Sequence, residues 1–547
     1  MKSILRKVTL AALLLVLLAS ASCACTVVMA GKKATVNGEV LVSYTCDGWY
    51  DNRLTVIPAK KYPKGAMAPV YKNICYQTKP DVKLEKVGEI PQAAQTYAYF
   101  HTGYPIMNEK SLVFGEYTWG GREENECPTA WMMIEQLEIY GLQRAATARE
   151  AIKVMGAIAE KYGYGDGGEA LAVADKNEVW LFEITGPGPL WNQESGKPGA
   201  VWVAQRVPDD MYGMGSNRAR IGEINFSDPN NFMYSKNIKS FAKDMGWWKE
   251  GEKFNFHKIY NPEPYGSPYY QLRREWRVYN LLSPSVKLNP NAKEQYPLFQ
   301  KPDKKLTVKD LMVVCRDYLE GTKYDLTKGL AAGPFGTPTR YPTGKAQKPE
   351  NRKSNDWDRP ISLFRCSYSF AAQIRPNMPD EIAAIAWFGL DQPHTTVYMP
   401  IFAGTTKLPA CMDVYDRATF NQKSLFWAFN LVANWADLKH SYMIKDIRAE
   451  QSRLEDQFFK TVPGAEKKFM ELYKAKNIAG ADESITTYVN NNVEEVYKDW
   501  WALAWKLIGK YSDGYVIDEK GKNVTVGYPT EWLSKVGFGD NDAEPKK

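Results

Sequence analysis

Short apolar runs separated by turn residues cover most of the chain, and helical spacing takes over near its end. The runs at residues 25–31, 40–45 and 54–57 are rich in Val, Thr, Leu and Ile, a composition that favours strands. Asn37-Gly38 separates the first two runs and predicts a hairpin turn. Further strands are predicted at residues 97–101, 112–117, 170–174, 179–184, 201–206, 361–369, 382–388 and 396–400.

Helical spacing is clearest at residues 147–162, where Ala151, Val154, Met155 and Ile158 recur every three or four positions. Other helices are predicted at residues 129–140, 306–319, 424–477 and 486–511, and residues 187–290 are expected to be rich in loops. The strands cluster and do not alternate with helices, which indicates an α+β protein with a helical C-terminal portion.

The first 24 residues have the pattern of a secretory signal peptide. Lys2, Arg6 and Lys7 precede an apolar run from Leu10 to Leu18, and small residues follow. Cleavage after Ala24 would leave Cys25 as the mature N-terminus. No later run approaches the ~20 apolar residues of a membrane span. We therefore expect an exported protein, periplasmic or extracellular. The sequence does not say whether signal peptidase alone exposes Cys25.

A lipoprotein is the competing interpretation of this leader. Cys23 would then carry the lipid, but a lipoprotein signal usually has an aliphatic residue where Ser20 stands. Export also implies an oxidising compartment. The six cysteines that remain besides Cys23 and Cys25 are even in number and compatible with disulfides, but their pairing stays open: Cys46, Cys75, Cys127, Cys315, Cys366 and Cys411.

The composition is that of an ordinary globular protein and excludes several classes. Hydrophobic residues make up 44% and charged residues 24% of the 547 residues. The net charge of +7 is too weak at this length to indicate nucleic acid as a partner. The four histidines do not occur at metal-ligand spacing, so neither a metal nor another cofactor is expected.

Familiar motifs are absent or stand in the wrong context. The segment Gly163-Tyr-Gly165-Asp-Gly167-Gly168 matches G-x-G-x-x-G, but a dinucleotide loop follows a strand and opens a helix. Here a predicted helix precedes the glycines and a strand follows, which predicts a plain connecting loop. No G-x-S-x-G nucleophile elbow occurs.

Cys25 remains as a candidate nucleophile. A thiol needs a base to form a thiolate near neutral pH, and the α-amine of an N-terminal cysteine has an ordinary pKa of about 7.7–8.0. One terminal residue can thus supply both nucleophile and general base, without a histidine. A disulfide partner next to a cleavage site is the alternative role for Cys25.

The neighbourhood of Cys25 resembles the secreted dipeptidases of the dipeptidase A family, which are N-terminal-nucleophile hydrolases related to choloylglycine hydrolase and penicillin V acylase. The similarity starts with Cys25-Thr-Val-Val-Met-Ala-Gly-Lys-Lys-Ala-Thr-Val-Asn-Gly38, Ser43-Tyr-Thr-Cys-Asp-Gly48 and Asp51-Asn-Arg53. More blocks follow in order: Met107–Lys110 with Gly115–Thr118, Val179–Glu183, Ser216–Ile221, Arg273–Trp276, Glu320–Thr322 with Asp325–Thr327, Pro360–Ser362 with Cys366–Tyr368, and Trp387–Gly389 with Val397–Pro400.

This resemblance implies a fold and a set of roles. The fold would be a four-layer αββα sandwich over residues 25–410, with a mainly helical portion at 411–547 packed on it. Cys25 would be the nucleophile, Asp47 would hold its amine, and Asn217 would donate to the oxyanion.

Other roles are less defined by the resemblance. Thr118 would line the pocket, where it could contact the oxyanion. Either Arg273 or Arg274 would correspond to the family arginine near the cysteine. Tyr44 stands where the related acylases carry an arginine three residues before the acid, so the surroundings of the amine could differ.

The implied reaction is hydrolysis of dipeptides through a thioester. A dipeptidase must reject longer chains, so we expect a closed pocket that recognises the free substrate amine with an acid, and Glu116 and Glu183 are the candidates. Two alternatives stay open: an acylase for bile-salt or penicillin-type amides, and a secreted ligand-binding protein whose 17 Trp and 33 Tyr would stack on ligands.

Overall fold

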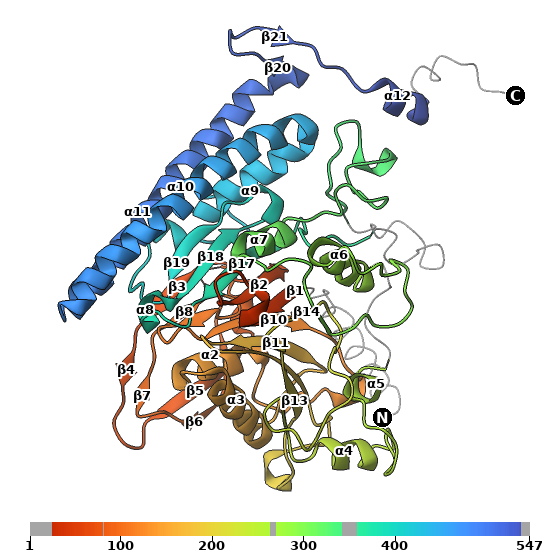
Figure 1. The fold of residues 1–547 in the computed structure, drawn as a ribbon, viewed down its shortest axis with the longest axis vertical. Coiled ribbons are helices and arrows are strands. Elements are labelled where there is room, and N and C mark those ends of the chain that lie inside the picture. Colours follow the sequence, from red (N-terminus) through yellow and green to blue (C-terminus); the bar gives the residue numbers. More distant parts are fainter. Residues whose placement is uncertain (1–24, 80, 263–269, 342–357, 538–547) are drawn as a thin grey trace, which may run out of the picture.

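Two large antiparallel sheets form the centre of the molecule (Figure 1). The computed structural model describes residues 25–79, 81–262, 270–341 and 358–537. The first sheet has the strand order β16-β14-β1-β2-β17-β18-β19. Its strands are β1 Thr26–Ala30, β2 Val40–Asp47, β14 Tyr212–Gly215, β16 Phe299–Gln300, β17 Cys366–Ile374, β18 Ala384–Leu390 and β19 Met399–Phe402.

The second sheet has the order β15-β13-β12-β11-β10-β9-β8-β3. Its strands are β3 Thr55–Ile57, β8 Tyr99–His101, β9 Met107–Asn108, β10 Val113–Thr118, β11 Glu169–Ala174, β12 Val179–Thr185, β13 Val201–Arg206 and β15 Phe232–Tyr234. Three small pairs lie outside the large sheets: β4 Lys60–Lys61 with β7 Gln95–Thr96, β5 Met67–Lys72 with β6 Glu85–Pro91, and β20 Val516–Ile517 with β21 Asn523–Val524.

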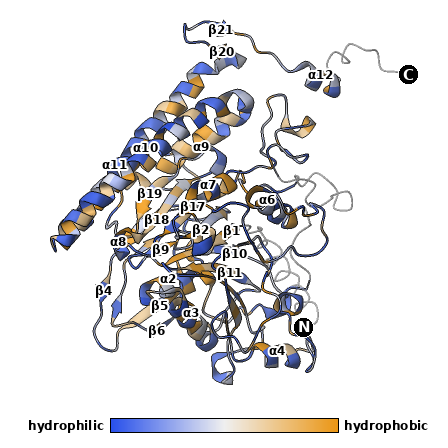
Figure 2. Cartoon of the chain, in the orientation of Figure 1, coloured by the Kyte–Doolittle hydropathy of each residue, from blue (hydrophilic) through white to orange (hydrophobic). Residues whose placement is uncertain are grey.

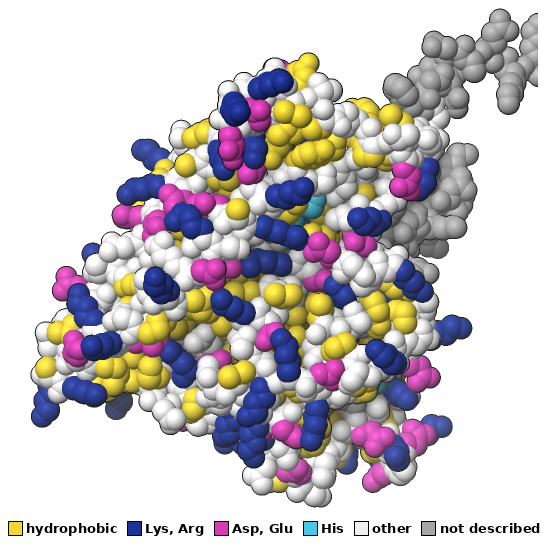
Figure 3. Space-filling model, turned by 45° about the horizontal axis from the view of Figure 1, so that its top comes forward, with side chains coloured by type: hydrophobic (Ala, Val, Ile, Leu, Met, Phe, Trp, Pro, Cys, Tyr) yellow, Lys and Arg dark blue, Asp and Glu magenta, His cyan; other side chains and the backbone are white. Residues whose placement is uncertain are grey.

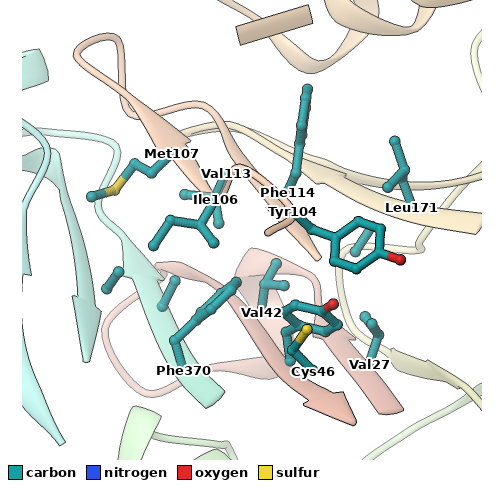
Figure 4. Close-up of a cluster of buried hydrophobic side chains, with 14 of the residues drawn as sticks. Val27, Val42, Cys46, Tyr104, Ile106, Met107, Val113, Phe114, Leu171 and Phe370 are labelled. Atoms are coloured by element: carbon teal, nitrogen blue, oxygen red, sulfur yellow. The ribbon is translucent and has the colours of Figure 1, made fainter. Parts of the chain in front are cut away.

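The two sheets pack face to face. Strands β1 and β2 of the first sheet contact β10 and β11 of the second, and Figure 4 shows Val27, Val42 and Phe370 among the side chains that meet Val113 and Leu171 there. All five residues of β1 and all eight of β2 are buried. Strands covered on both faces read as continuous apolar runs, which explains why β1 and β2 stand out in the sequence.

Helices cover the outer faces of both sheets. Helix α2 (Ile134–Arg144) contacts β8 and β9, while α3 (Ala148–Tyr162) contacts β11, β12 and β13 of the second sheet. A capping box of Thr147 and Glu150 starts α3. On the first sheet, α7 (Val308–Cys315) lies on β2 and β17. The layer order is therefore helix, sheet, sheet, helix.

Three long C-terminal helices complete the layer on the first sheet. They are α9 Leu425–Ala436, α10 His440–Lys474 and α11 Ile478–Lys510, and they pack on β18 and β19. Figure 2 shows apolar residues in the central strands and alternating polar and apolar residues on α10 and α11, the pattern of half-covered helices. The remaining helices are α4 Ile238–Asp244, α5 Phe256–Tyr260, α6 Leu272–Leu282, α8 Asp380–Ala383 and α12 Thr530–Val536.

The α+β prediction is confirmed, and the predicted strands of both central sheets lie within a few residues of the observed ones. The glycine-rich segment 163–168 is indeed a loop between α3 and β11. The prediction of a loop-rich stretch at 187–290 is wrong in part, because it contains α4, α5, α6 and the central strand β14. The domain limit at residue 410 stays a prediction.

The seven described cysteines are all free thiols. The disulfides that the sequence allows therefore do not occur among them.

None of the described helices combines the length and apolar character of a membrane span. Figure 3 shows basic and acidic side chains interspersed over one face of the molecule. The predicted leader and Cys23 lie outside the described residues.

Candidate active site

Cys25 lies directly before β1 and is completely buried. Strand β1 runs between β14 and β2 in the middle of the first sheet. Its thiol contacts Oε2 of Glu116 on β10 at 3.4 Å and the hydroxyl of Tyr44 on β2 at 3.6 Å. The sulfur is therefore held where the two sheets face each other.

Tyr44 and Glu116 form a hydrogen-bonded pair beside the sulfur. The Tyr44 hydroxyl donates to Oε2 of Glu116 at 2.9 Å. Burial raises the pKa of Glu116 above its ordinary value, although hydrogen bonds from Glu169, Tyr44 and Cys25 oppose this. The tyrosine that departs from the acylase pattern thus takes part in the site.

Asp47 ends β2 and is anchored by one of its two carboxylate oxygens. Nη2 of Arg359 donates to Oδ2 at 2.5 Å, and the Thr45 hydroxyl donates to the same oxygen at 3.2 Å. Oδ1 is buried and has no hydrogen-bond partner among the described residues. Burial raises the pKa of Asp47 to about 6, while Arg359 and Arg274 act in the opposite direction. A buried oxygen without a donor is an open acceptor position.

Asn217 follows β14 in the left-handed conformation, with φ 60°, which asparagine adopts more readily than most residues. Its Oδ1 accepts from Nη2 of Arg274 at 2.7 Å and from Nη1 of Arg359 at 3.0 Å. Its Nδ2 donates to the carbonyl of Thr118 at 2.7 Å. Two guanidinium donors at the oxygen fix the orientation of the Asn217 amide.

The structure separates the two neighbouring arginines. Nη1 of Arg274 donates to the carbonyl of Cys25 at 2.8 Å and to the Thr26 hydroxyl at 2.9 Å. Arg273 instead donates to Asp358 at 2.6 Å and to the carbonyl of Pro290 at 2.7 Å. Adjacent residues on a helix point about 100° apart. Of the two candidate arginines, Arg274 therefore lies beside Cys25, whereas Arg273, expected to bind substrate, contacts Asp358 and Pro290.

Of the two candidate glutamates, Glu116 and Glu183, one lies beside Cys25 and the other does not. Glu183 on β12 accepts from the backbone amides of Arg220 at 2.5 Å and Ile221 at 3.2 Å, and from the Tyr117 hydroxyl at 3.4 Å. Its carboxylate holds a loop and does not contact Cys25. Only Glu116 of the pair reaches the sulfur.

Thr118 connects the site to a further acid. Its hydroxyl lies 2.8 Å from Oε1 of Glu169 and 3.4 Å from Oε1 of Glu116. Because its carbonyl accepts from Asn217, Thr118 lies at the border of the site as expected for a pocket residue. Its hydroxyl, however, faces carboxylates, which does not suit the oxyanion contact considered for it.

The sequence reasoning missed Arg359 and Glu169. Arg359 stands directly before the Pro360–Ser362 block, and Glu169 is a charged residue at the start of an apolar strand. Both are charged residues next to apolar segments that are predicted to be buried. Because buried charges need partners, this position could have indicated a site role.

Burial raises the pKa of the Cys25 thiol well above its ordinary value, and Cys46 and Glu116 add to the effect. The sequence joins Cys25 to Ala24 through a peptide bond, so the residue carries an amide nitrogen and no α-ammonium. An ammonium beside the sulfur would favour the thiolate.

A family model describes most of the chain. The model of peptidase family C69 matches residues 24–453, starting one residue before Cys25. The chain belongs to peptidase family C69. This confirms the resemblance found in the sequence, and it makes this C69 protein a hydrolase of the peptidase class.

Several curated proteins are similar to this C69 peptidase over most of their length. A probable dipeptidase of Latilactobacillus sakei is 28% identical over 394 residues, 69% of this chain and 74% of that protein. A probable dipeptidase of Salmonella dublin is 25% identical, covering 70% and 81%. Dipeptidase A of Lactobacillus helveticus is 23% identical over 504 residues, 86% and 94% of the two chains.

Proposed function

We propose that this protein is an exported cysteine dipeptidase in which Cys25, as the mature N-terminal residue, is the nucleophile. Relatives named dipeptidase cover 69–86% of the chain. The observation that carries the proposal is the unpartnered Oδ1 of buried Asp47, next to a cysteine whose side chain meets the hydrogen-bonding groups of two sheets. A free α-ammonium at residue 25 would give that oxygen a donor.

The layer order supports the same assignment. Two face-to-face antiparallel sheets covered by helices, with the nucleophile at the start of a central strand, suit an N-terminal-nucleophile hydrolase of the αββα type. Cleavage after Ala24 and export to the periplasm or the exterior are part of the proposal, since the mechanism needs a free amine at Cys25.

The chemistry follows from the positions of these groups. The α-amine takes the thiol proton, and the thiolate attacks the carbonyl carbon of the peptide bond. The side-chain amide of Asn217 stabilises the oxyanion. The α-ammonium then protonates the leaving amine, which leaves as a free amino acid. Water, activated by the same amine, cleaves the thioester and releases the first amino acid.

Arg274 and Arg359 support this chemistry without touching the reacting bond. Arg274 fixes the carbonyl of Cys25 and the amide of Asn217, while Arg359 joins Asn217 to Asp47. Together they hold the nucleophile, the oxyanion donor and the acid that positions the amine in one rigid unit.

The test compares the mature protein with three variants on Ala-Ala. Cys25→Ser should lose nearly all turnover, and Cys127→Ala, which changes a buried thiol that contacts Thr129 and Trp191, should keep it. One extra alanine placed before Cys25 removes the free amine without changing a side chain. It should lower kcat by about 10²–10⁴-fold, the usual contribution of a general base.

N-terminal sequencing of the exported protein completes the test. A mature chain that begins at Cys25 supports the mechanism, and one that begins elsewhere and still turns over contradicts it. Preferential hydrolysis of penicillin V or a glycine-conjugated bile salt over Ala-Ala would make the protein an acylase. Dipeptide binding without turnover would make it a binding protein.

A further inference from the structure

Two buried glutamates lie side by side next to the nucleophile. Glu116 is on β10 and Glu169 is on β11, directly opposite Thr118 in the strand register. Their exposed fractions are 1% and 3%. The Thr118 hydroxyl lies between them, at 3.4 Å from one carboxylate and 2.8 Å from the other. We call these two residues the acid pair.

Glu116 differs from the other acids of the site in its partners. Its hydrogen bonds come from the Cys25 thiol, the hydroxyls of Tyr44 and Thr118 and the carboxyl group of Glu169. Across the described ranges, no lysine or arginine forms an ion pair with it. Buried carboxylates normally have a cation or several backbone donors nearby. Glu116 has neither, and burial raises its pKa accordingly.

The geometry of a dipeptide brings its α-ammonium group close to Glu116. The amine nitrogen of the first residue lies about 2.5 Å from the carbonyl carbon, given ordinary bond lengths and angles. The attacking sulfur approaches that carbon to about 3–3.5 Å. The amine is therefore within about 6 Å of Sγ. Oε2 of Glu116 lies 3.4 Å from Sγ, so these distances allow it to form a salt bridge with the amine.

The two ends of the site carry opposite charge. Glu116 and Glu169 belong to the second sheet, whereas Arg274 and Arg359 bind Asn217 and Asp47 around the start of β1. A zwitterionic substrate would be attracted to the acid pair by its amine. A metal ion is a poorer occupant, because no group of three potential ligands is found in the part of the chain that the structure describes.

We infer that Glu116 and Glu169 together bind the α-ammonium group of the substrate, so that the enzyme cleaves the peptide bond next to a free amino terminus. This inference rests on the proposed function. Glu116 makes the direct contact beside the sulfur, and Glu169 supplies the second carboxylate with Thr118 between them. The pair makes the free amine a condition for productive binding.

Glu169→Gln is the decisive variant, because Glu169 contacts Thr118 and Glu116 and the variant keeps both the Cys25 thiol and the α-amine of that residue. The substrates are Ala-Ala and its desamino analogue propionyl-alanine, which lacks only the amine. We expect wild-type protein to prefer Ala-Ala strongly in kcat/KM. Glu169→Gln should reduce this preference about tenfold to hundredfold, the effect of losing one charge-assisted contact, chiefly through KM for Ala-Ala.

Glu160→Gln is the matched control. Glu160 lies on the outer helix α3 and accepts a hydrogen bond from the Trp202 indole. This variant should leave the preference unchanged. Equal losses on both substrates in Glu169→Gln would overturn the inference, because they would indicate a general effect on catalysis or folding.

Calorimetric binding separates this inference from the proposed function. In Cys25→Ala, which cannot turn over, Ala-Ala should bind and propionyl-alanine should bind at least about tenfold more weakly. Equal binding of the two ligands overturns the acid pair even if wild-type protein is a dipeptidase. A clear preference for Ala-Ala in a protein that does not hydrolyse it would refute the proposed function and support the acid pair.

Discussion

Helix α6 carries two adjacent residues into two buried polar clusters that differ in kind. Arg274 reaches the cluster around Cys25, where Asp47 keeps an unpartnered oxygen and Glu116 has only neutral donors. Glu275 reaches a second cluster, in which Arg218 binds it through two nitrogens at 2.8 Å and Arg220 through one at 2.6 Å. The second cluster is satisfied, so it stabilises the fold. The first is incomplete, so it can accept a ligand.

The same contrast separates Glu183 from Glu116. Both are buried glutamates on the second sheet, but two backbone amides hold Glu183. The kind of donor therefore distinguishes the two acids: backbone amides hold the structural acid Glu183, whereas side-chain thiol and hydroxyl groups contact the candidate substrate-binding acid Glu116.

The largest effect is expected from Glu275→Ala. It leaves two buried guanidinium groups without their carboxylate, which typically costs about 3–5 kcal/mol. Urea unfolding followed by circular dichroism should show the loss. A loss below about 1 kcal/mol would mean that the second cluster does not stabilise the fold.

Asn217→Ala should mainly affect turnover. Losing one oxyanion donor typically lowers kcat by about 10²–10³-fold, with KM little changed. Because residue 217 has positive φ, Asn217→Gly should be the more stable of the two variants. It should nevertheless be equally slow, and a recovery of kcat in Asn217→Gly would refute the oxyanion role.

A matched pair of arginine variants sharpens the comparison within α6. Arg274→Gln removes the contacts with Cys25 and Asn217 and should lower kcat by about tenfold or more. Arg273→Gln removes contacts with Asp358 and Pro290 and should lower stability while leaving kcat nearly unchanged. Steady-state kinetics on folded protein decides, and the reverse pattern would return the site role to Arg273.

The smallest effect concerns pH. Burial raises the pKa of Glu135 and Glu183 to about 7, from an ordinary value of 4.5. The folded state therefore binds more protons than the unfolded state between pH 4.5 and 7. The stabilisation by these two glutamates is complete below pH 4.5 and is lost as pH rises through 7. The four histidines, whose pKa values burial lowers, change stability in the opposite direction, so removing one glutamate isolates its contribution.

Scanning fluorimetry on two variants measures that contribution. Glu135→Gln should raise Tm at pH 8 relative to Tm at pH 5, in comparison with wild-type protein, whereas Glu531→Gln, at an exposed position, should not. An unchanged pH dependence of Tm in Glu135→Gln would contradict the prediction.

How far the sequence predicted the fold depended on burial. Strands β1, β2 and β11 are covered on both faces and appear as apolar runs, so they could be predicted. Strand β14 could not, because two of its four residues are glycines, which weaken strand propensity. Helix α6 was missed because its interior is rich in arginine and glutamate that only tertiary ion pairs explain.

The site was predictable where one chain segment or a family resemblance sufficed. Cys25 was predicted from its place after the leader, and Asp47 and Asn217 from the family resemblance; the structure brings the three together. Arg273 and Arg274 could not be separated, since only the rotation of α6 decides which one faces Cys25. Arg359 lies 312 residues from its partner Asp47, and no local pattern reports such a contact.

That wide spacing along the chain has a consequence for folding. The groups around Cys25 come from segments near residues 47, 116, 217, 274 and 359, so they meet only after both sheets have closed. Partly collapsed forms that already contain the three long C-terminal helices would have the helical signal and no turnover. Enzymatic rate is thus a stricter measure of refolding yield than helix content.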